Sequence, residues 1–446
     1  MKQENIQELF SRTAERCAGR TAAEHLDRSV TYAELERQSN KLANFLLARG
    51  ASKGSVAAIL CDDSIAITTA IIGTLKANCV FVPLEPAMPD NRLAAMLAEA
   101  APEWFLIDSK YAHRLSHIAP HGGGAKARVI ELDGAQAASS YPPHLTRLDE
   151  YDAYTQTEKP SVSSEPDDFC YLYFTSGSTG RPKGIAGRLK GIDHFIRWEI
   201  KTLGLEEGVH VSQLITPSFD AFLRDIFVPL CAGGTICVPP SRETVLDGRQ
   251  LVRWIDERRI NLIHCVPSLF RSLLNAEPPR ERLSALRYIL LSGEPLLPAD
   301  VRKWTELYGE RTQLVNLYGP SETTMTKFFY FVSPADKDAP FISIGRPMEG
   351  AKAVVVGENG KACRAGKVGE IYIRTPFRTL GYYRQPELTR EVFVQNPFST
   401  DPEDIVYKTG DLGRVLANGN FEFLGRKDHQ VKIRGVRIEL KEIENL

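Results

Sequence analysis

A loop of glycine and hydroxyl residues that ends in a lysine has the composition of a phosphate-binding loop. It reads TSGSTGRPK from Thr175 to Lys183 and follows the apolar run 169–174. Backbone N–H groups in such a loop can approach phosphate oxygens, hydroxyls can donate hydrogen bonds and Lys183 supplies positive charge. The G-x-x-x-x-G-K-[ST] spacing of a Walker loop is absent. Because glycine-serine loops are commonly plain surface turns, this one alone supports only a hypothesis of phosphate binding.

Five further segments follow this loop in a fixed order. They are NLYGPSETT (316–324), GEIYIRT (369–375), TLGYYRQPELT (379–389), YKTGDLGR (407–414) and GRKDHQVKIRGVRIELKEIE (425–444). Together with TSGSTGRPKG they resemble the motifs of the adenylate-forming superfamily, which includes acyl-CoA synthetases, firefly luciferase and the adenylation domains of nonribosomal peptide synthetases. Within it, FDAFLRD (219–225) and QVKIRGVRIEL (430–440) are similar to the amino-acid-activating domains.

The resemblance implies that a substrate carboxylate attacks the α-phosphorus of ATP, with Mg²⁺ bound, to give an acyl-adenylate and pyrophosphate. Glu322 matches the glutamate that binds magnesium, a role that suits a hard oxygen ligand. Thr323 would contact the α-phosphate. The pyrophosphate end would be held by Thr175, Ser176, Gly177, Ser178, Thr179, Gly180 and Lys183.

The resemblance also assigns the adenosine contacts. Tyr318 would lie against the adenine ring, although a buried core tyrosine is the alternative. Asp411 would accept hydrogen bonds from the ribose hydroxyls, and Arg426 would be the second ribose contact. The residues expected around the base are Gly293, Glu294, Pro295, Asn316, Leu317 and Gly319.

Asp220 matches the aspartate that pairs with the α-ammonium group of an amino acid. The alternative is a helix N-cap. The expected side-chain pocket consists of Phe219, Ala221, Arg224, His264, Leu290, Ser292, Leu317, Met325 and Thr326. Arg224 and His264 could recognise a polar or acidic side chain. Equally, Arg224 could pair with Asp225 or another acid and His264 could be a hydrogen-bonded core residue, so the amino acid stays undecided.

Two features depart from the family pattern. Leu189 stands near the place where most members carry a histidine, and we do not expect His194 to replace it.

The family's mobile C-terminal domain, of roughly 100 residues as is common for a small domain, would begin at a hinge matching Asp428, so only its first strands are present. The late catalytic lysine is missing, because the sequence is cut there or because an inserted domain follows. We expect ATP and amino-acid binding but slow adenylate formation; Lys432 is a candidate lid or thioesterification residue, or simply a solvated lysine.

The elements that position these motifs alternate between apolar strand-like runs and amphipathic helices. A helix is expected over 30–50 and a buried one over 64–75, with strands over 55–62 and 79–85. A polar, proline-rich connection (141–168) separates this first alternation from a second one. The strand candidates of the second are 169–174, 211–215, 234–240, 260–266, 288–293 and 312–319. Parallel sheets place ligand sites at the carboxyl ends of their strands, where these glycine-rich stretches fall.

The expected architecture is α/β: two layered α/β subdomains and, from about residue 344, a small distorted β-barrel, with 1–427 forming the core and 428–446 the start of the lid. The 446 residues carry a net charge of −1, which gives no field for nonspecific binding of nucleic acid or anionic membrane. The N-terminus lacks the pattern of a signal peptide, so we expect a cytoplasmic protein. The eight cysteines are scattered without metal-ligand spacing and are expected to be reduced.

The expected partners are a peptidyl carrier protein bearing phosphopantetheine and neighbouring synthetase domains. A coenzyme A or aryl-acid ligase, and a non-catalytic binding scaffold without the lid, are the alternatives.

Overall fold

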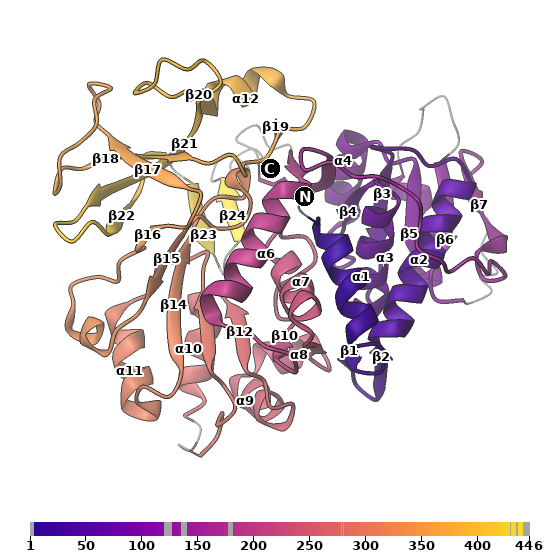
Figure 1. Cartoon of the computed structure of the whole chain (residues 1–446), viewed down its shortest axis with the longest axis horizontal. Coiled ribbons are helices and arrows are strands. Elements are labelled where there is room, and N and C mark those ends of the chain that lie inside the picture. The colour runs from indigo at the N-terminus through magenta and orange to yellow at the C-terminus, as the bar shows by residue number, and fades with distance from the viewer. Residues whose placement is uncertain are drawn as a thin grey trace.

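The computed structural model describes residues 4–119, 127–134, 141–176, 182–277, 279, 281–428, 430–433 and 436–439. Within this part, two large sheets stand on either side of a central group of helices, and a smaller sheet lies above one of them (Figure 1). The layered α/β architecture predicted from the sequence is confirmed.

The first large sheet has eight described strands, and those from β8 outward through β4, β3, β5, β6 and β7 are parallel. Two antiparallel strands, β9 and β19, complete its other edge. In sheet order the strands are β19 (Gly381–Tyr382), β9 (Lys183–Arg188), β8 (Phe169–Thr175), β4 (Val80–Pro83), β3 (Val56–Leu60), β5 (Trp104–Ile107), β6 (Ala127–Glu131) and β7 (Leu145–Arg147).

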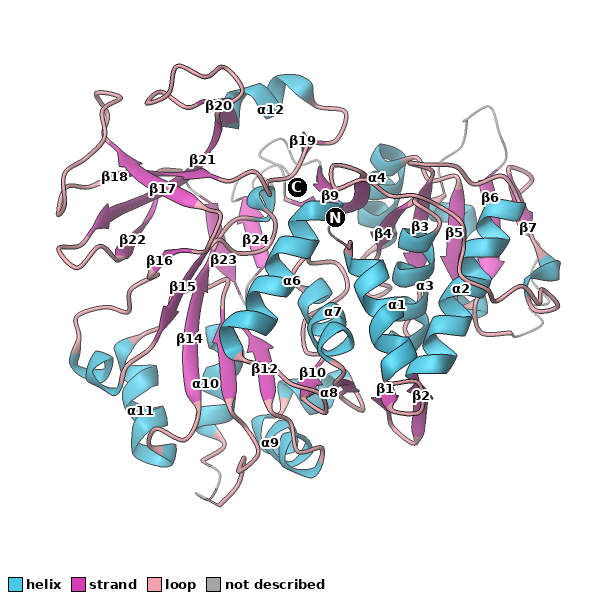
Figure 2. Ribbon diagram, viewed as in Figure 1, coloured by secondary structure: helices cyan, strands magenta, loops and turns pink. Residues whose placement is uncertain are grey.

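The second large sheet has nine described strands with a parallel centre and antiparallel edges (Figure 2). In order they are β16 (Arg346–Pro347), β15 (Phe328–Phe331), β14 (Gln313–Tyr318), β13 (Tyr288–Leu291), β12 (Leu262–Cys265), β10 (His210–Ser212), β11 (Thr235–Val238), β1 (Thr21–His25) and β2 (Arg28–Thr31). We call the first and second large sheets, each with the helices that cover it, the first and second lobes. The hairpin β1–β2 precedes the strands of the first lobe in the sequence, yet it completes the sheet of the second lobe. No local pattern indicated this long-range pairing.

The predicted β subdomain is present as a five-stranded antiparallel sheet. Its strands are β17 (Lys352–Val356), β18 (Gly369–Arg374), β20 (Phe393–Gln395), β21 (Ile405–Val415) and β22 (Phe421–Arg426). After it, β23 (Gln430–Ile433) and β24 (Val436–Glu439) form a separate two-stranded sheet.

Helices cover the faces of these sheets, and the two helices expected over 30–50 and 64–75 are found as α2 and α3. α2 begins with a capping box in which Thr31 and Glu34 exchange hydrogen bonds with each other's backbone. The α-helices are α1 (Ile6–Arg16), α2 (Tyr32–Ala48), α3 (Ser64–Lys76), α4 (Asp90–Ala100), α5 (Leu115–Ile118), α6 (Leu189–Leu203), α7 (Phe222–Ala232), α8 (Arg242–Leu246), α9 (Gly248–Glu257), α10 (Pro267–Asn275), α11 (Pro298–Tyr308) and α12 (Pro386–Val392). Short 3-10 turns are η1 (Ser109–Arg114), η2 (Asp149–Tyr151), η3 (Ser321–Thr323) and η4 (Pro334–Asp338).

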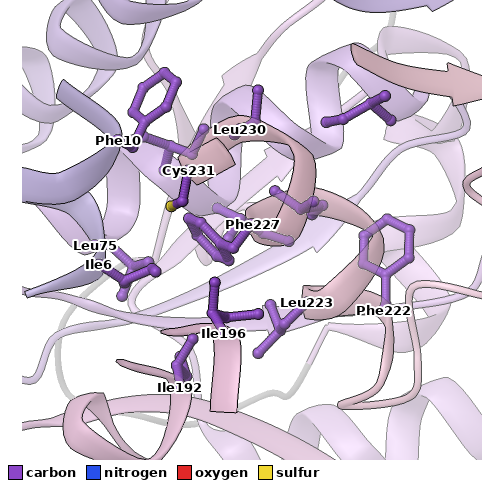
Figure 3. Packing of buried hydrophobic residues seen from close by; sticks show 14 of the residues in the cluster. Ile6, Phe10, Leu75, Ile192, Ile196, Phe222, Leu223, Phe227, Leu230 and Cys231 are labelled. Atoms are coloured by element: carbon purple, nitrogen blue, oxygen red, sulfur yellow. The ribbon is translucent and has the colours of Figure 1, made fainter. Parts of the chain in front are cut away.

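The largest hydrophobic cluster lies between the two large sheets and joins them. Figure 3 shows labelled side chains from α1, α3, α6 and α7 gathered in this cluster, among them Phe10, Leu75, Ile196 and Phe227. Because helices from both halves of the sequence bury their apolar faces in this one cluster, the two lobes share a core.

The cysteine expectation from the sequence is confirmed. All eight cysteines lie in the described part and are free, and seven of them are buried. No described helix has both the length and the apolar character needed to cross a bilayer.

Candidate functional site

A cavity of about 240 Å³ opens at the carboxyl ends of β12, β13 and β14. This is the edge of the sheet at which the sequence predicted a ligand site. The residues that line it are Thr175, Leu214, Ile215, Thr216, Phe219, Asp220, Ala221, His264, Cys265, Val266, Leu269, Ser292, Gly293, Tyr318, Gly319, Pro320, Ser321, Met325, Thr326, Asp411 and Arg426. Thirteen of these are predicted site residues, brought together from both lobes and from the β subdomain.

The predicted phosphate loop joins β8 to β9. Thr175 ends β8 and lies opposite Lys183, the first residue of β9. Ser176 is buried next to it. The predicted contacts Gly177, Ser178, Thr179 and Gly180 lie outside the described residues.

Glu322 and Lys183 are linked through a tyrosine that the sequence did not single out. The hydroxyl of Tyr382 donates a 2.9 Å hydrogen bond to Oε1 of Glu322, and Nζ of Lys183 lies 5.9 Å from the centre of the same ring. Tyr382 is brought here by the pairing of β19 with β9. The motif TLGYYRQPELT therefore contributes a hydroxyl that orients the predicted metal ligand.

Glu322 and Thr323 form the turn η3 and are almost fully buried. The backbone carbonyl of Glu322 accepts a 2.7 Å hydrogen bond from Oγ1 of Thr379, while Oγ1 of Thr323 donates to the carbonyl of Pro320 at 3.0 Å. Neither residue lines the cavity as described, but their neighbours Pro320 and Ser321 do. Within the described residues no three histidine, cysteine or acidic side chains meet in a metal-binding arrangement. Glu322 would therefore share a metal ion with ligands other than a cluster of such side chains.

Tyr318, Asp411 and Arg426 meet at the other end of the cavity. The Tyr318 hydroxyl donates to Oδ2 of Asp411, and Nη1 of Arg426 donates to Oδ1 of Asp411 at 2.7 Å. Burial, followed by the Asp411 charge, raises the pKa of Tyr318 well above its usual value, so this tyrosine stays a neutral donor. The three predicted adenosine contacts therefore form one hydrogen-bonded group, with Asp428, the predicted hinge residue, bound to Arg426 behind it.

Several residues predicted around the base have side chains that contact other parts of the protein. Asn316 is buried and its side-chain N–H group donates to the carbonyl of Ser343 at 2.8 Å, so its amide faces the core of the second lobe. The Glu294 carboxylate accepts from the backbone and hydroxyl of Ser268 at the start of α10. Leu317 belongs to the central hydrophobic cluster, and Pro295 is outside the lining. Gly293 and Gly319 do line the cavity, and a Cβ at Gly319 would lie 2.5 Å from Cα of Thr326.

Asp220 lies in the loop before α7, and only 6% of its surface is exposed. Its Oδ1 accepts a hydrogen bond from the Ser321 hydroxyl and its Oδ2 accepts one from the Met325 N–H, both at 3.0 Å. The N-cap of α7 is Ala221 and no side chain caps it, so Asp220 does not serve as the alternative N-cap. Burial raises the pKa of Asp220 above its usual value, against the hydrogen bonds from Met325 and Ser321 that favour the charged form.

Arg224 and His264 belong to a buried ionic cluster in which Glu199 is the central acid. His264 directs Nε2 to Glu199 at 2.5 Å and Nδ1 to Asp225 at 2.7 Å, and Nε of Arg224 donates to Glu199 at 3.2 Å. All four side chains are fully buried. Burial and the Arg224 charge act to lower the pKa of His264, but the two carboxylates outweigh them and the net shift is upward.

This cluster decides between the alternatives left open by the sequence. Both ring nitrogens of His264 are engaged by carboxylates, so His264 is a hydrogen-bonded core residue although it also lines the cavity. Arg224 pairs with an acid, but with Glu199 rather than Asp225, and it is outside the cavity lining. Leu290 likewise packs in the central cluster. Of the predicted pocket, Phe219, Ala221, His264, Ser292, Met325 and Thr326 line the cavity.

Several residues in or beside the cavity were not predicted from the sequence. Glu199 could have been noticed, because it falls in phase with the apolar face of α6 formed by Ile192, Phe195 and Ile196, where a charge is unusual. Tyr382 lay inside a recognised motif but carried no assigned role. The apolar lining Leu214, Ile215, Val266 and Leu269 gave no signal, since apolar residues at strand ends are ordinary core residues.

Comparison with known proteins agrees with this geometry. The family described as AMP-binding enzyme matches residues 10–383. Surfactin synthase subunit 2 of Bacillus subtilis (strain 168) is 32% identical over 443 residues, covering 98% of this chain and 12% of that protein. Bacitracin synthase 3 of Bacillus licheniformis is 34% identical over 444 residues, covering 100% of this chain and 6% of that protein. The chain thus spans only a small part of these curated relatives.

Solved structures share the fold. The nonribosomal peptide synthetase FmoA3 in its AMPPNP-bound form has a TM-score of 0.82 at 25% identity, over 95% of this chain and 43% of that chain. NpsA-ThdA of Klebsiella oxytoca, an artificially fused adenylation-PCP di-domain, also has a TM-score of 0.82, at 23% identity, and covers 100% of this chain and 83% of that chain. Because the family match extends over most of the sequence, the chain belongs to the AMP-binding enzyme family.

Proposed function

We propose that this chain activates an amino acid with ATP. A carboxylate oxygen of the amino acid attacks the α-phosphorus, the bond from this phosphorus to the β-phosphate oxygen breaks, and an aminoacyl-adenylate and pyrophosphate result. The observation that carries the proposal is the position of Asp220: a buried carboxylate faces the cavity and is hydrogen-bonded to Ser321 and Met325, on either side of Glu322 and Thr323. An ammonium group at Asp220 therefore lies one short turn away from the residues expected to hold the phosphates.

The nucleotide would occupy the rest of the cavity. Asp411 has two oxygens with about four acceptor sites, so it can accept from the ribose hydroxyls while keeping its bonds to Tyr318 and Arg426. Thr175 and Lys183 would face the phosphates. The negative carboxylate and the negative α-phosphate repel each other. The main task of the residues around the cavity is to hold the two together in spite of this repulsion.

The donor set fits magnesium, which takes one or two carboxylates and completes its shell with phosphate oxygens and water. Glu322 supplies a buried carboxylate oriented by Tyr382. Bound Mg²⁺ would neutralise charge on the phosphates. The side chain of Glu322 would hold it, and Lys183 would add positive charge nearby.

We further propose that the aminoacyl group passes to a phosphopantetheine thiol on a peptidyl carrier protein, in the cytoplasm and beside other synthetase domains. The similarity to short parts of surfactin and bacitracin synthases supports neighbouring domains, and the di-domain structure pairs this fold with a carrier in another protein.

The test is ATP–pyrophosphate exchange over the proteinogenic amino acids and their 2-hydroxy analogues, with calorimetric binding of ATP and Mg²⁺ as a second measurement. Asp220→Asn should lower kcat/KM for the preferred amino acid by about 100-fold, because a buried charge pair is lost, and should leave the Kd for ATP within about twofold. An unchanged preference in Asp220→Asn would instead support an aryl-acid or coenzyme A ligase. Absence of ATP binding by the unaltered chain would support a scaffold.

A further inference from the structure

The turn between η3 and β15 holds two consecutive residues in the left-handed region of backbone conformation, Thr324 with φ 69° and Met325 with φ 57°. This conformation is uncommon for residues other than glycine, and for a β-branched threonine it is a genuine outlier that strains the backbone. The turn joins Glu322 and Thr323 to Met325 and Thr326, which line the cavity. The surrounding structure must therefore hold it in place.

One peptide group in this turn is held from both sides. The N–H of Met325 donates to Oδ2 of Asp220 at 3.0 Å, and the carbonyl of Thr324, on the same peptide, accepts from Nζ of Lys327 at 2.6 Å. Nζ of Lys327 also donates to the carbonyl of Thr326 at 3.1 Å. The peptide dipole is aligned between a carboxylate and an amine, so the two hydrogen bonds strengthen each other.

Lys327 is an unexpected residue in this position. Its side chain is fully buried, and no carboxylate among the described residues forms an ion pair with it. Its Nζ lies 5.9 Å from the centre of the Phe195 ring. Burial lowers the pKa of Lys327 to about 7, although the Asp220 charge acts in the opposite direction. An apolar side chain would fill this space at lower cost, since a buried lysine loses its hydration.

We propose that Lys327 is a positioning residue for the amino acid: together with Asp220 it fixes the Thr324–Met325 peptide and so sets the wall of the amino-acid pocket. This inference rests on the proposed function. Without Lys327 the carbonyls of Thr324 and Thr326 lose a donor inside the core, and the turn is free to leave its strained conformation. The Met325 N–H then moves away from Asp220, which loses the geometry that receives the ammonium group.

The test compares Lys327→Met with Lys76→Met. Lys76 is the control because it too is a buried lysine whose amine is hydrogen-bonded inside the protein. It ends α3, donates to Glu36, Ser39 and Asn40 of α2 and lies outside the cavity lining. The probe is the proteinogenic amino acid that gives the unaltered chain the largest melting-temperature shift with Mg²⁺ and a non-hydrolysable ATP analogue. Calorimetry then measures the Kd of each ligand.

Lys327→Met should weaken binding of this amino acid about tenfold, the scale of one hydrogen bond to a charged group, and change the Kd of the ATP analogue less than twofold. Lys76→Met should change neither Kd. Adding Thr324→Gly to Lys327→Met should restore part of the amino-acid affinity, because glycine adopts positive φ without strain. A residue that only filled the core would not respond in this way.

Unchanged amino-acid affinity in folded Lys327→Met protein, or equal losses for both ligands, would overturn the proposal. If Lys327→Met does not fold, Lys327→Gln decides by the same comparison. Failure of the proposed function is a separate outcome, because in that case no amino acid binds to the unaltered chain.

Discussion

Among single residues, Tyr382 is the one whose hydroxyl should affect the affinity for Mg²⁺ most directly. It orients Oε1 of Glu322, and partners of a metal ligand commonly contribute 10–100-fold to metal affinity. Tyr382→Phe should therefore raise the Mg²⁺ concentration needed for half-maximal ATP binding by about tenfold. Calorimetric titrations of ATP at a series of Mg²⁺ concentrations measure this.

Tyr383→Phe is the control, because that neighbouring ring packs against Phe169 in the first lobe. Equal effects of the two substitutions would show that the loss comes from packing around β19 and not from the bond to Glu322.

The buried cluster around Glu199 should make the free energy of unfolding sensitive to the charge of this one side chain. Glu199→Gln removes the negative charge that Arg224 and His264 share in the core, and breaking a buried pair in this way costs about 3–5 kcal/mol. Chemical denaturation should show a loss of that size. Glu349→Gln, which breaks the exposed pair with Lys201, should change the free energy of unfolding by about 0.5 kcal/mol or less. Similar losses from both variants would contradict the assigned role of burial.

These residues show what a single sequence can and cannot reveal. Asp220, Tyr318, Asp411 and Arg426 were found because motifs fix their identity, and they do meet in the cavity. Motif membership could not say which protein groups an amide contacts: the side chain of Asn316 donates to the carbonyl of Ser343, a contact that no motif indicated. The partner of His264 and Arg224 escaped because Glu199 comes from another helix, and such a contact depends on tertiary packing.

At the scale of elements, helix α6 carries an acid whose protonation should affect stability. Burial raises the pKa of Asp193 to about 7, against the opposing effects of the Arg197 guanidinium and the Ile6 N–H, and Oδ1 of Asp193 has no hydrogen-bond partner in the described part of the chain. Between pH 4 and 7 the folded state thus keeps a proton that the unfolded state releases. The contribution of Asp193 to stability must fall as the pH rises through this window.

Asp193→Asn should remove this penalty. The variant should be more stable than the unaltered chain at pH 8, by on the order of 3 kcal/mol, and the difference should vanish near pH 4. Denaturation at a series of pH values measures the difference, with Glu391→Gln on α12 as an exposed helical control. A difference that does not vary with pH would mean that the amide stabilises α6 for another reason.

The elements themselves were predictable where their signals are local. The helix over 30–50 and the buried helix over 64–75 were both predicted from the apolar pattern of their own residues. Strand pairing was not, because it depends on segments far apart: β1 lies against β11, and β19 adds to β9 across nearly 200 residues of chain, on the order of the size of a whole domain.

At the scale of the whole molecule, these long-range pairings and the shared core predict how the protein unfolds. A chain of 446 residues with two large sheets would ordinarily unfold in more than one step. Here β1 and β2 belong to the sheet of the second lobe, and the central cluster draws on α1, α3, α6 and α7 together. Neither lobe can lose its structure without exposing the apolar surface of the other.

Calorimetric unfolding should therefore give one transition for both lobes, with a van't Hoff enthalpy close to the calorimetric enthalpy. Leu75→Ala and Phe227→Ala, from opposite sides of this core, should lower that one melting temperature together and leave it single. Two separated transitions, each moved by only one of these substitutions, would show that the lobes fold independently.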